Sequence, residues 1–149
     1  MTPYKILVAT VAITALAACS RQDVPDLNSQ NPTTGRWYTA EQVKQGNALY
    51  DANCISCHHP RGSGTPDWRK PLADGSYPPP PLNGTAHTWH HSLQVLLNTL
   101  EEGGIPMGGK MPAFGKTLDD EQKLAVIAYL QSQWRDEIYS QWLQRQSPQ

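Results

Sequence analysis

The sequence predicts an all-α fold built as one domain. Three segments place apolar residues at the three- and four-residue intervals of an amphipathic helix, and the stretches between them are rich in proline and glycine. The chain shows neither an internal repeat nor the alternation of apolar and polar residues that marks a strand. Its 149 residues suit a single domain with some tail to spare.

Composition limits the kinds of partner and the size of the core. The net charge is −1 and no run of lysine or arginine occurs, which argues against nucleic-acid binding. Large apolar side chains are scarce in the folded part, with Phe114 the single phenylalanine. We therefore expect a core that side chains alone fill thinly.

Residues 1–18 are predicted to be an export signal peptide. Lys5 gives the segment a positive start, and the 13 mostly apolar residues that follow are too few to span a bilayer of about 30 Å as a helix. Two cleavage sites remain open. Residues 15–17, Ala-Leu-Ala, suit ordinary signal peptidase, whereas residues 16–19, Leu-Ala-Ala-Cys, resemble the lipobox of bacterial lipoproteins.

Cys19 favours the second site, because an isolated cysteine directly after an apolar run has few other uses. It would then be the lipidated N-terminus and anchor the protein to a membrane. Ser20, in place of aspartate, resembles the residue that sorts lipoproteins to the outer membrane of Gram-negative cells, which predicts a periplasmic location. Residues 19–36 are polar and lack aromatic side chains, so we expect a flexible tether before a folded domain at residues 37–149.

The first helix is expected to follow Thr39 and to lead into a cysteine motif. Thr39 and Gln42 form the pattern of a capping box, and Val43, Gly46 and Tyr50 follow at helical spacing. The helix then delivers the residues "CISCH" at positions 54–58.

This motif predicts one covalently bound haem c. The thiols of Cys54 and Cys57 are spaced so that they can add to the two vinyl groups of one haem, and His58 beside them is then an axial ligand of the iron. With Cys19 assigned to the lipid, the three cysteines leave none for a structural disulfide.

Zinc and redox-dithiol sites are the alternatives for the same motif. A zinc site needs a second pair of ligands, for which His90 and His91 are candidates, but adjacent side chains chelate less readily than spaced ones. A dithiol of the thioredoxin type needs a βαβ unit, which the helical pattern does not supply. His87, His90 and His91 could also bind copper or offer a second axial ligand, although a polar start to the next helix is the simpler interpretation.

Two further helices follow the proline-rich loop. Leu93, Leu96, Leu97 and Leu100 repeat at i, i+3, i+4 and i+7, and the pattern stops at two glycines. The third helix is expected to start with Thr117 as its N-cap and to run through Trp134. No glycine or proline follows until Pro148, so residues 135–149 are expected to form a helical extension.

From about residue 36 to residue 134 the chain resembles class I monohaem cytochromes c. "GNALYDANCISCHH" is similar to the first helix and haem motif of that family, and "GGKMPAFGKTLDDEQKLAVIAYLQSQW" is similar to its methionine loop and final helix. The resemblance implies a cytochrome c-like fold of three or more helices around the haem, with the first and last helices crossing where Gly46 approaches Tyr129. Residues 61–77 are longer than in compact members; they and residues 135–149 form either a partner surface or a solvated loop and tail.

The resemblance also assigns the loop "PPLNG" at residues 80–84. It implies that the Pro80 carbonyl accepts the ring N–H of His58 and that Leu82 lies against the haem, with Pro79 and Pro81 as alternatives to Pro80. His59 is expected to face solvent. Candidates for hydrogen bonds to the haem propionates, among which the sequence does not choose, are Trp68, Trp89, Arg61 and Arg69.

The sixth iron ligand is predicted to be Met111. Met1 leaves with the signal peptide, so Met107 and Met111 are the two methionines in reach. Met107 precedes two glycines, whereas Pro112 after Met111 restricts the backbone and stiffens the loop. "MPAFG" also matches the family's methionine loop, and Met107 is then an apolar residue near the haem edge.

These residues predict an electron-transfer protein rather than an enzyme. With His58 and Met111 on the iron, no small-molecule substrate binds there, and the partners are redox proteins that donate and accept electrons. The alternatives are a haem enzyme or gas-binding protein with an open sixth position, and a haem subunit of a larger oxidase or dehydrogenase complex.

Overall fold

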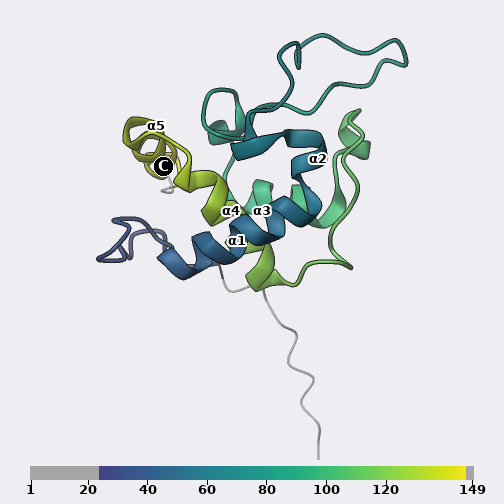
Figure 1. The fold of residues 1–149 in the computed structure, drawn as a ribbon. Helices are drawn as coiled ribbons and strands as arrows, with labels where there is room; N and C mark the ends of the chain where they lie inside the picture. The colour runs from purple at the N-terminus through teal and green to yellow at the C-terminus, as the bar shows by residue number, and fades with distance from the viewer. Residues whose placement is uncertain (1–23, 147–149) are drawn as a thin grey trace, which may run out of the picture.

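The computed structural model describes residues 24–146, which fold into five α-helices, with long loops before and after α3 (Figure 1). The helices are α1 (Ala40–Asn53), α2 (Ile55–His58), α3 (Leu93–Glu102), α4 (Asp120–Ser132) and α5 (Asp136–Gln144). Short 3₁₀ turns occur at Pro60–Gly62, Thr88–His90 and Ile105–Met107. Within residues 24–146 there is no strand, and no helix has the length and apolar character needed to cross a bilayer. The all-α prediction is confirmed; the signal peptide and Cys19 lie outside the described residues.

The crossing of α1 and α4 forms the centre of the fold. A Cβ on Gly46 would collide with the backbone carbonyl of Ala125 and lie 2.9 Å from the Cβ of Tyr129. Only glycine allows the two helices to pack this closely. Beside this contact the rings of Tyr50 and Tyr129 lie 5.2 Å apart. The close approach predicted for Gly46 is confirmed, with the backbone of Ala125 as a second neighbour.

Aromatic side chains supply much of the core. Trp and Tyr residues from both ends of the chain are buried: Trp37, Tyr38, Tyr50, Tyr129, Trp134, Tyr139 and Trp142. The core is therefore fuller than its single phenylalanine suggests. Two of these residues come from α5, so residues 136–144 form part of the core rather than a solvated tail.

The start and end of α4 differ from the sequence-based expectation. Its N-cap is Asp119 rather than Thr117, because Asp119 and Gln122 form a capping box in which each side chain bonds the other's backbone N–H. The N–H of Thr117 instead bonds the carbonyl of Phe114 in the preceding turn. The helix ends at Ser132, and the indole of Trp134 donates to the carbonyl of Leu82 at 2.8 Å.

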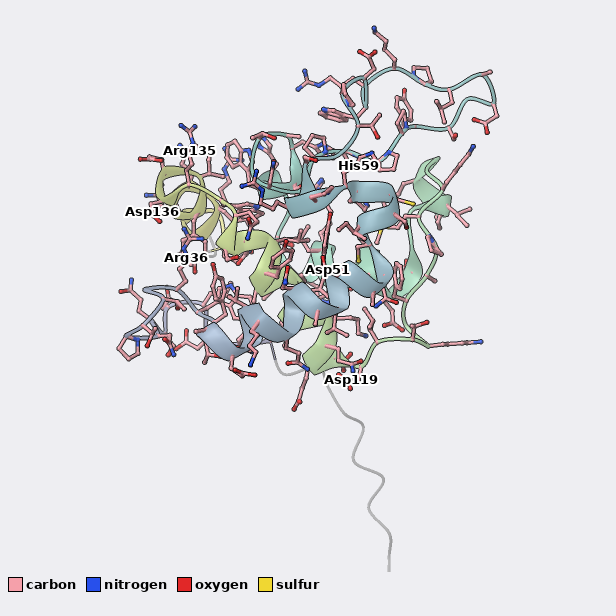
Figure 2. The ribbon with its side chains drawn as sticks, viewed as in Figure 1. Arg36, Asp51, His59, Asp119, Arg135 and Asp136 are labelled. Carbon is pink, nitrogen blue, oxygen red and sulfur yellow. The ribbon has the colours of Figure 1, made fainter. Side chains whose placement is uncertain are left out.

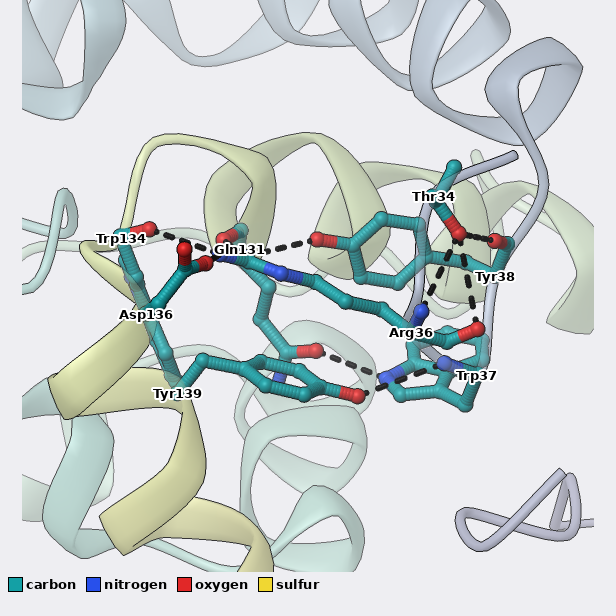
Figure 3. A network of polar contacts seen from close by, with 8 residues as sticks. All are labelled: Thr34, Arg36, Trp37, Tyr38, Gln131, Trp134, Asp136 and Tyr139. Carbon is teal, nitrogen blue, oxygen red and sulfur yellow. Dashed lines mark hydrogen bonds and ion pairs between the residues drawn. The ribbon is translucent and has the colours of Figure 1, made fainter. Parts of the chain in front are cut away.

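Arg36 joins the N-terminal segment to the junction of α4 and α5 (Figure 3). Its Nη1 donates to the hydroxyl of Tyr38 and to the carbonyl of Gln131, and its Nη2 donates to the carbonyl of Trp134 at 3.0 Å. Nη2 also pairs with the carboxylate of Asp136 at 2.8 Å. The guanidinium thus adds charged hydrogen bonds to a carbonyl in the last turn of α4, which also accepts the N–H of Trp134, and to a carbonyl in the linker to α5.

The folded part of the chain begins before residue 37. Leu27 packs against the core, and a turn is closed by a 2.8 Å hydrogen bond from the N–H of Asn31 to the carbonyl of Arg36. Thr34 adds a hydrogen bond from its hydroxyl to the carbonyl of Tyr38. The described part of the expected tether, residues 24–36, is therefore attached to the domain.

Candidate functional site

The cysteine motif lies where α1 turns into α2. The carbonyl of Tyr50 accepts the N–H of Cys54 at 2.8 Å, and the carbonyl of Cys54 accepts the N–H of His58 at 2.9 Å. Cys54 is buried and Cys57 is exposed, and no disulfide joins them. Burial, with the nearby Cys57, raises the pKa of the Cys54 thiol to about 11. Both sulfurs are therefore present as free cysteines, one facing inward and one outward.

His58 is buried with one ring nitrogen already bonded. The ring nitrogen Nδ1 of His58 lies 3.1 Å from the carbonyl oxygen of Pro80. Since a carbonyl only accepts, Nδ1 carries the proton and Nε2 is left as an electron-pair donor. Burial lowers the pKa of the His58 imidazole, while the bond to Pro80 acts in the opposite direction. A neutral ring with a free Nε2 is the form that ligates metals.

The last three carbonyls of the proline run each have a different partner. The carbonyl of Pro79 accepts the backbone N–H of Thr65 at 2.9 Å, and that of Pro81 accepts the hydroxyl of Thr88 at 3.1 Å. The carbonyl of Pro80, between them, bonds His58. This arrangement singles out Pro80 from its two neighbours as the partner of the imidazole.

Leu82 is tied to the turn that follows the motif. Its N–H donates to the carbonyl of Gly62 at 2.7 Å, and its partly buried side chain packs against the core. Gly64 donates to the carbonyl of His58 at 2.8 Å and has φ of +64°, and a Cβ there would lie 2.5 Å from the backbone of Pro80. Short contacts on both segments therefore fix the position of the Pro80 carbonyl against His58.

The turn after His58 contains two residues in strained backbone conformations. His59 has φ of 59° and ψ of 170°, a region that glycine alone adopts readily, and Arg61 has φ of 57°. The carbonyl of His59 accepts the hydroxyl of the buried Tyr50 at 2.7 Å. The His59 side chain is exposed, as expected, and Figure 2 shows it on the outside of the turn after α2. The sequence does not indicate this role of Tyr50, because its helical spacing predicts packing alone.

The two candidate methionines differ in burial. Met107 is 67% exposed, whereas Met111 is partly buried and packs against the core. The backbone of Met111 is held by a hydrogen bond from the N–H of Gly104 to its carbonyl, at 2.9 Å. Gly103 has φ of +78°, and a Cβ there would lie 2.6 Å from the same carbonyl. The two glycines that end the α3 pattern thus allow the methionine loop to fold back closely.

The insertion at residues 61–77 reaches the methionine loop. The carboxylate of Asp74 pairs with the ammonium of Lys110 at 2.6 Å, one residue before Met111. Hydrogen bonds from Lys110 and then from Ser76 lower the pKa of Asp74. Sequence analysis missed this pair, because nothing in the spacing of the two residues indicates a contact.

The candidates for propionate contacts lie partly around His87 and His90 and partly in the turn after His58. Trp68 stacks on His87 with ring centroids 4.8 Å apart, and the guanidinium of Arg69 lies 4.7 Å from the Trp68 ring. Trp89 stacks on the next histidine along, His90, at 3.9 Å. Arg61 belongs instead to the strained turn after His58.

The donor set at residues 54–58 fits a covalently attached haem better than the alternatives. In residues 24–146 no three His, Cys, Asp or Glu side chains lie together as a metal site, which leaves a zinc or copper site without enough ligands. The absence of strands in the same residues removes the βαβ setting of a thioredoxin-like dithiol. Two free thiols and one imidazole nitrogen, held by Pro80, are what haem c requires of a protein.

The helical fold and the Cys-x-x-Cys-His motif at the end of α1 define a c-type cytochrome domain. Residues 41–130, more than half of the chain, match the family model described as cytochrome c oxidase, cbb3-type, subunit III, and the chain belongs to this family. Neither a curated protein nor a solved structure matches the chain.

Proposed function

We propose that the protein carries single electrons on one haem c held by Cys54 and Cys57, with His58 and Met111 as axial ligands. The observation that carries the proposal is the state of His58: a buried, neutral imidazole whose Nδ1–H is engaged by the Pro80 carbonyl, directly after two free cysteines. Membership of a c-type cytochrome family supports it.

When bound, haem c supplies a one-electron couple between ferric and ferrous iron. The residues of the chain hold and tune it. Cys54 and Cys57 attach the group, and the Pro80 carbonyl keeps the His58 ring in one tautomer and raises its basicity. The partial burial of Met111 supports the thioether as the second ligand, which favours the reduced state. Leu82, partly buried two residues after Pro80, would lie against the haem.

Paired methionine substitutions test the axial ligands. Met111→Ala should abolish the weak sulfur-to-iron absorption band of the oxidised protein, lower its midpoint potential and permit carbon monoxide to bind the reduced protein. Met107→Ala is the matched control, since this side chain is 67% exposed, and it should change none of the three readouts. If the Met107 variant loses the band and the Met111 variant keeps it, the ligand assignment is wrong. If the wild type itself binds carbon monoxide rapidly, the protein is a haem enzyme or gas-binding protein.

Attachment of the haem is tested separately by mass. The wild-type protein should carry the mass of one haem through denaturation, and Cys54→Ala with Cys57→Ala should lose it. We further expect the double variant to lose cooperative unfolding, because a bound group stabilises the folded state. Native-like helicity and cooperativity without haem would contradict this second expectation.

A second candidate function is that of a haem subunit in an oxidase complex. The observation that favours it is the family description, which names a subunit of a cytochrome c oxidase. Affinity purification of the tagged protein from solubilised membranes distinguishes the two. Stoichiometric co-purification of other oxidase subunits would establish a subunit, whereas a free or loosely associated protein would establish a carrier that meets its redox partners transiently.

We also propose that the protein is exported and held by a lipid on Cys19 at the periplasmic side of a membrane, the outer membrane in a Gram-negative cell. Wild type should partition with membranes, and Cys19→Ser should become soluble or remain unprocessed, because acyl chains contribute about 0.8 kcal/mol per buried CH₂. A soluble mature wild type that begins at Ala18 would show ordinary cleavage instead.

A further inference from the structure

A cavity of about 500 Å³ lies between residues 84–90, the junction of α4 and α5, and the insertion. Its lining includes Arg69, Thr85, His87, Trp89, His90 and Arg135. Figure 2 shows Arg135 at the start of α5, beside the loop that contains residues 84–90. Three separate parts of the chain therefore contribute a basic side chain to one cavity.

Two indole rings, those of Trp68 and Trp89, stack with basic groups at or beside this cavity. The ring of Trp68 contacts both the guanidinium of Arg69 and the imidazole of His87, which stacks on it. Trp89 has the guanidinium of Arg145 4.6 Å from its ring centroid and His90 stacked 3.9 Å away. Stacking on indole orients the guanidinium of Arg69 and leaves its N–H groups able to donate, whereas Arg145, outside the lining, has its Nη1 2.6 Å from Nδ1 of His90.

No carboxylate balances these cations. None lines the cavity, and within residues 24–146 no carboxylate lies within 4.0 Å of Arg69, Arg135 or Arg145 in an ion pair. Asp136, next to Arg135, is paired with Arg36 instead, and Asp67, two residues before Arg69, is paired with Lys70. Burial lowers the pKa of His87, and the neighbouring His91, His90 and Arg69 lower it further. This favours a neutral His87, so the positive charge of the cavity comes from Arg69 and Arg135.

We propose that this cavity binds a phosphate group. Guanidinium groups match phosphate oxygens with pairs of parallel hydrogen bonds, and Arg69 and Arg135 line the cavity from two separate segments of the chain. Thr85 adds a hydroxyl, and Trp89 and Ile138 supply apolar surface for an organic part of the ligand. The phosphate belongs either to a soluble metabolite or to a lipid headgroup. The site is independent of the proposed haem ligands, none of which lines it.

Calorimetric titration of the purified haem-containing protein at low ionic strength tests the site. The probes are inorganic phosphate, glycerol 3-phosphate and dihexanoylphosphatidic acid below its micelle concentration. Binding of all three identifies a site for free phosphate compounds, and binding of the last alone identifies a lipid headgroup site. Arg69→Gln and Arg135→Gln should each weaken binding by about tenfold or more, because each removes a charge-assisted pair.

Lys116→Gln is the matched control, since it removes an exposed positive charge that does not line the cavity. It should leave binding unchanged. Three results would overturn the proposal. The first is that the wild type binds none of the probes, and the second is equal weakening of binding in all three variants, which would mean a general charge effect. The third is a shifted midpoint potential in the arginine variants while the wild type binds no phosphate, because these side chains would then serve the haem carboxylates. Unchanged far-ultraviolet circular dichroism of each variant ensures that folding is not the cause.

Discussion

Gly46→Ala is the substitution that tests the centre of the fold. The new Cβ would meet the carbonyl of Ala125 in the middle of α4, and it would also approach Tyr129. A side chain could rotate away from such a contact, but a helical carbonyl moves only with its whole helix. The two helices must therefore separate, which loosens the adjacent pair of Tyr50 and Tyr129.

The size of the effect follows from two opposing terms. Overpacking a core costs about 1–3 kcal/mol, and a backbone obstacle places this site at the upper end. Replacing glycine by alanine within a helix returns about 1 kcal/mol. We expect a net loss of about 2 kcal/mol in the free energy of unfolding, which lowers a urea midpoint by roughly 1 M.

Ala48→Gly in the same helix supplies the control. Ala48 is exposed, so this change measures the propensity term alone and should cost about 1 kcal/mol. Both variants are compared with wild type by urea denaturation followed by far-ultraviolet circular dichroism. If Gly46→Ala proves as stable as wild type while Ala48→Gly shows its expected loss, the close packing of α1 on α4 is refuted.

Three further predictions concern the ends and turns of the fold. Arg36→Met should lower the free energy of unfolding by about 2–4 kcal/mol, because it removes the charged hydrogen bonds to the carbonyls of Gln131 and Trp134 and the cation paired with Asp136. Asp136→Asn changes an exposed carboxylate and should cost far less in the same denaturation assay. His59→Gly should raise stability by roughly 1 kcal/mol by relieving the strain at its positive φ, and a loss of stability instead would show that the side chain makes a contact of its own. Burial, opposed by Arg36, raises the pKa of Tyr38 to about 12 from 10.0. The protonated hydroxyl therefore contributes its full stability below pH 10, and this contribution is lost as the pH rises from 10 toward 12. Tyr38→Phe should flatten that decline in stability, and an unchanged slope would exclude Tyr38 as its source.

The fold class and the helices were predictable because their signals are local. The capping box at Thr39, the leucine spacing of α3 and the need for glycine at position 46 all appear within a few residues of sequence. The N-cap of α4 was misplaced because Thr117 and Asp119 are both good capping residues. The local signal that separates them is Gln122, which stands three residues after Asp119 and completes a capping box, whereas the N–H of Thr117 is taken by the turn at Phe114.

The contacts that could not be predicted are those between distant segments. The pairing of Asp74 with Lys110 depends on the path of a loop without periodicity. The role of Arg36 depends on where α4 ends, and no glycine or proline marks that end. In the candidate site, the motif at residues 54–58 was predictable because its cysteines and histidine are contiguous in sequence, whereas the choice of Pro80 within the proline run came from the family resemblance.

The contacts of Arg36 also constrain the order in which the domain can be completed. They join residues 95 to 100 positions apart, so they form only after nearly the whole chain has been made. The thiol of Cys54, which is buried in the finished fold, is synthesised long before that point. A chain that emerges from its N-terminus therefore passes through a stage in which both cysteines are accessible and the two ends are not yet joined. Chemistry at Cys54 is easiest in that interval.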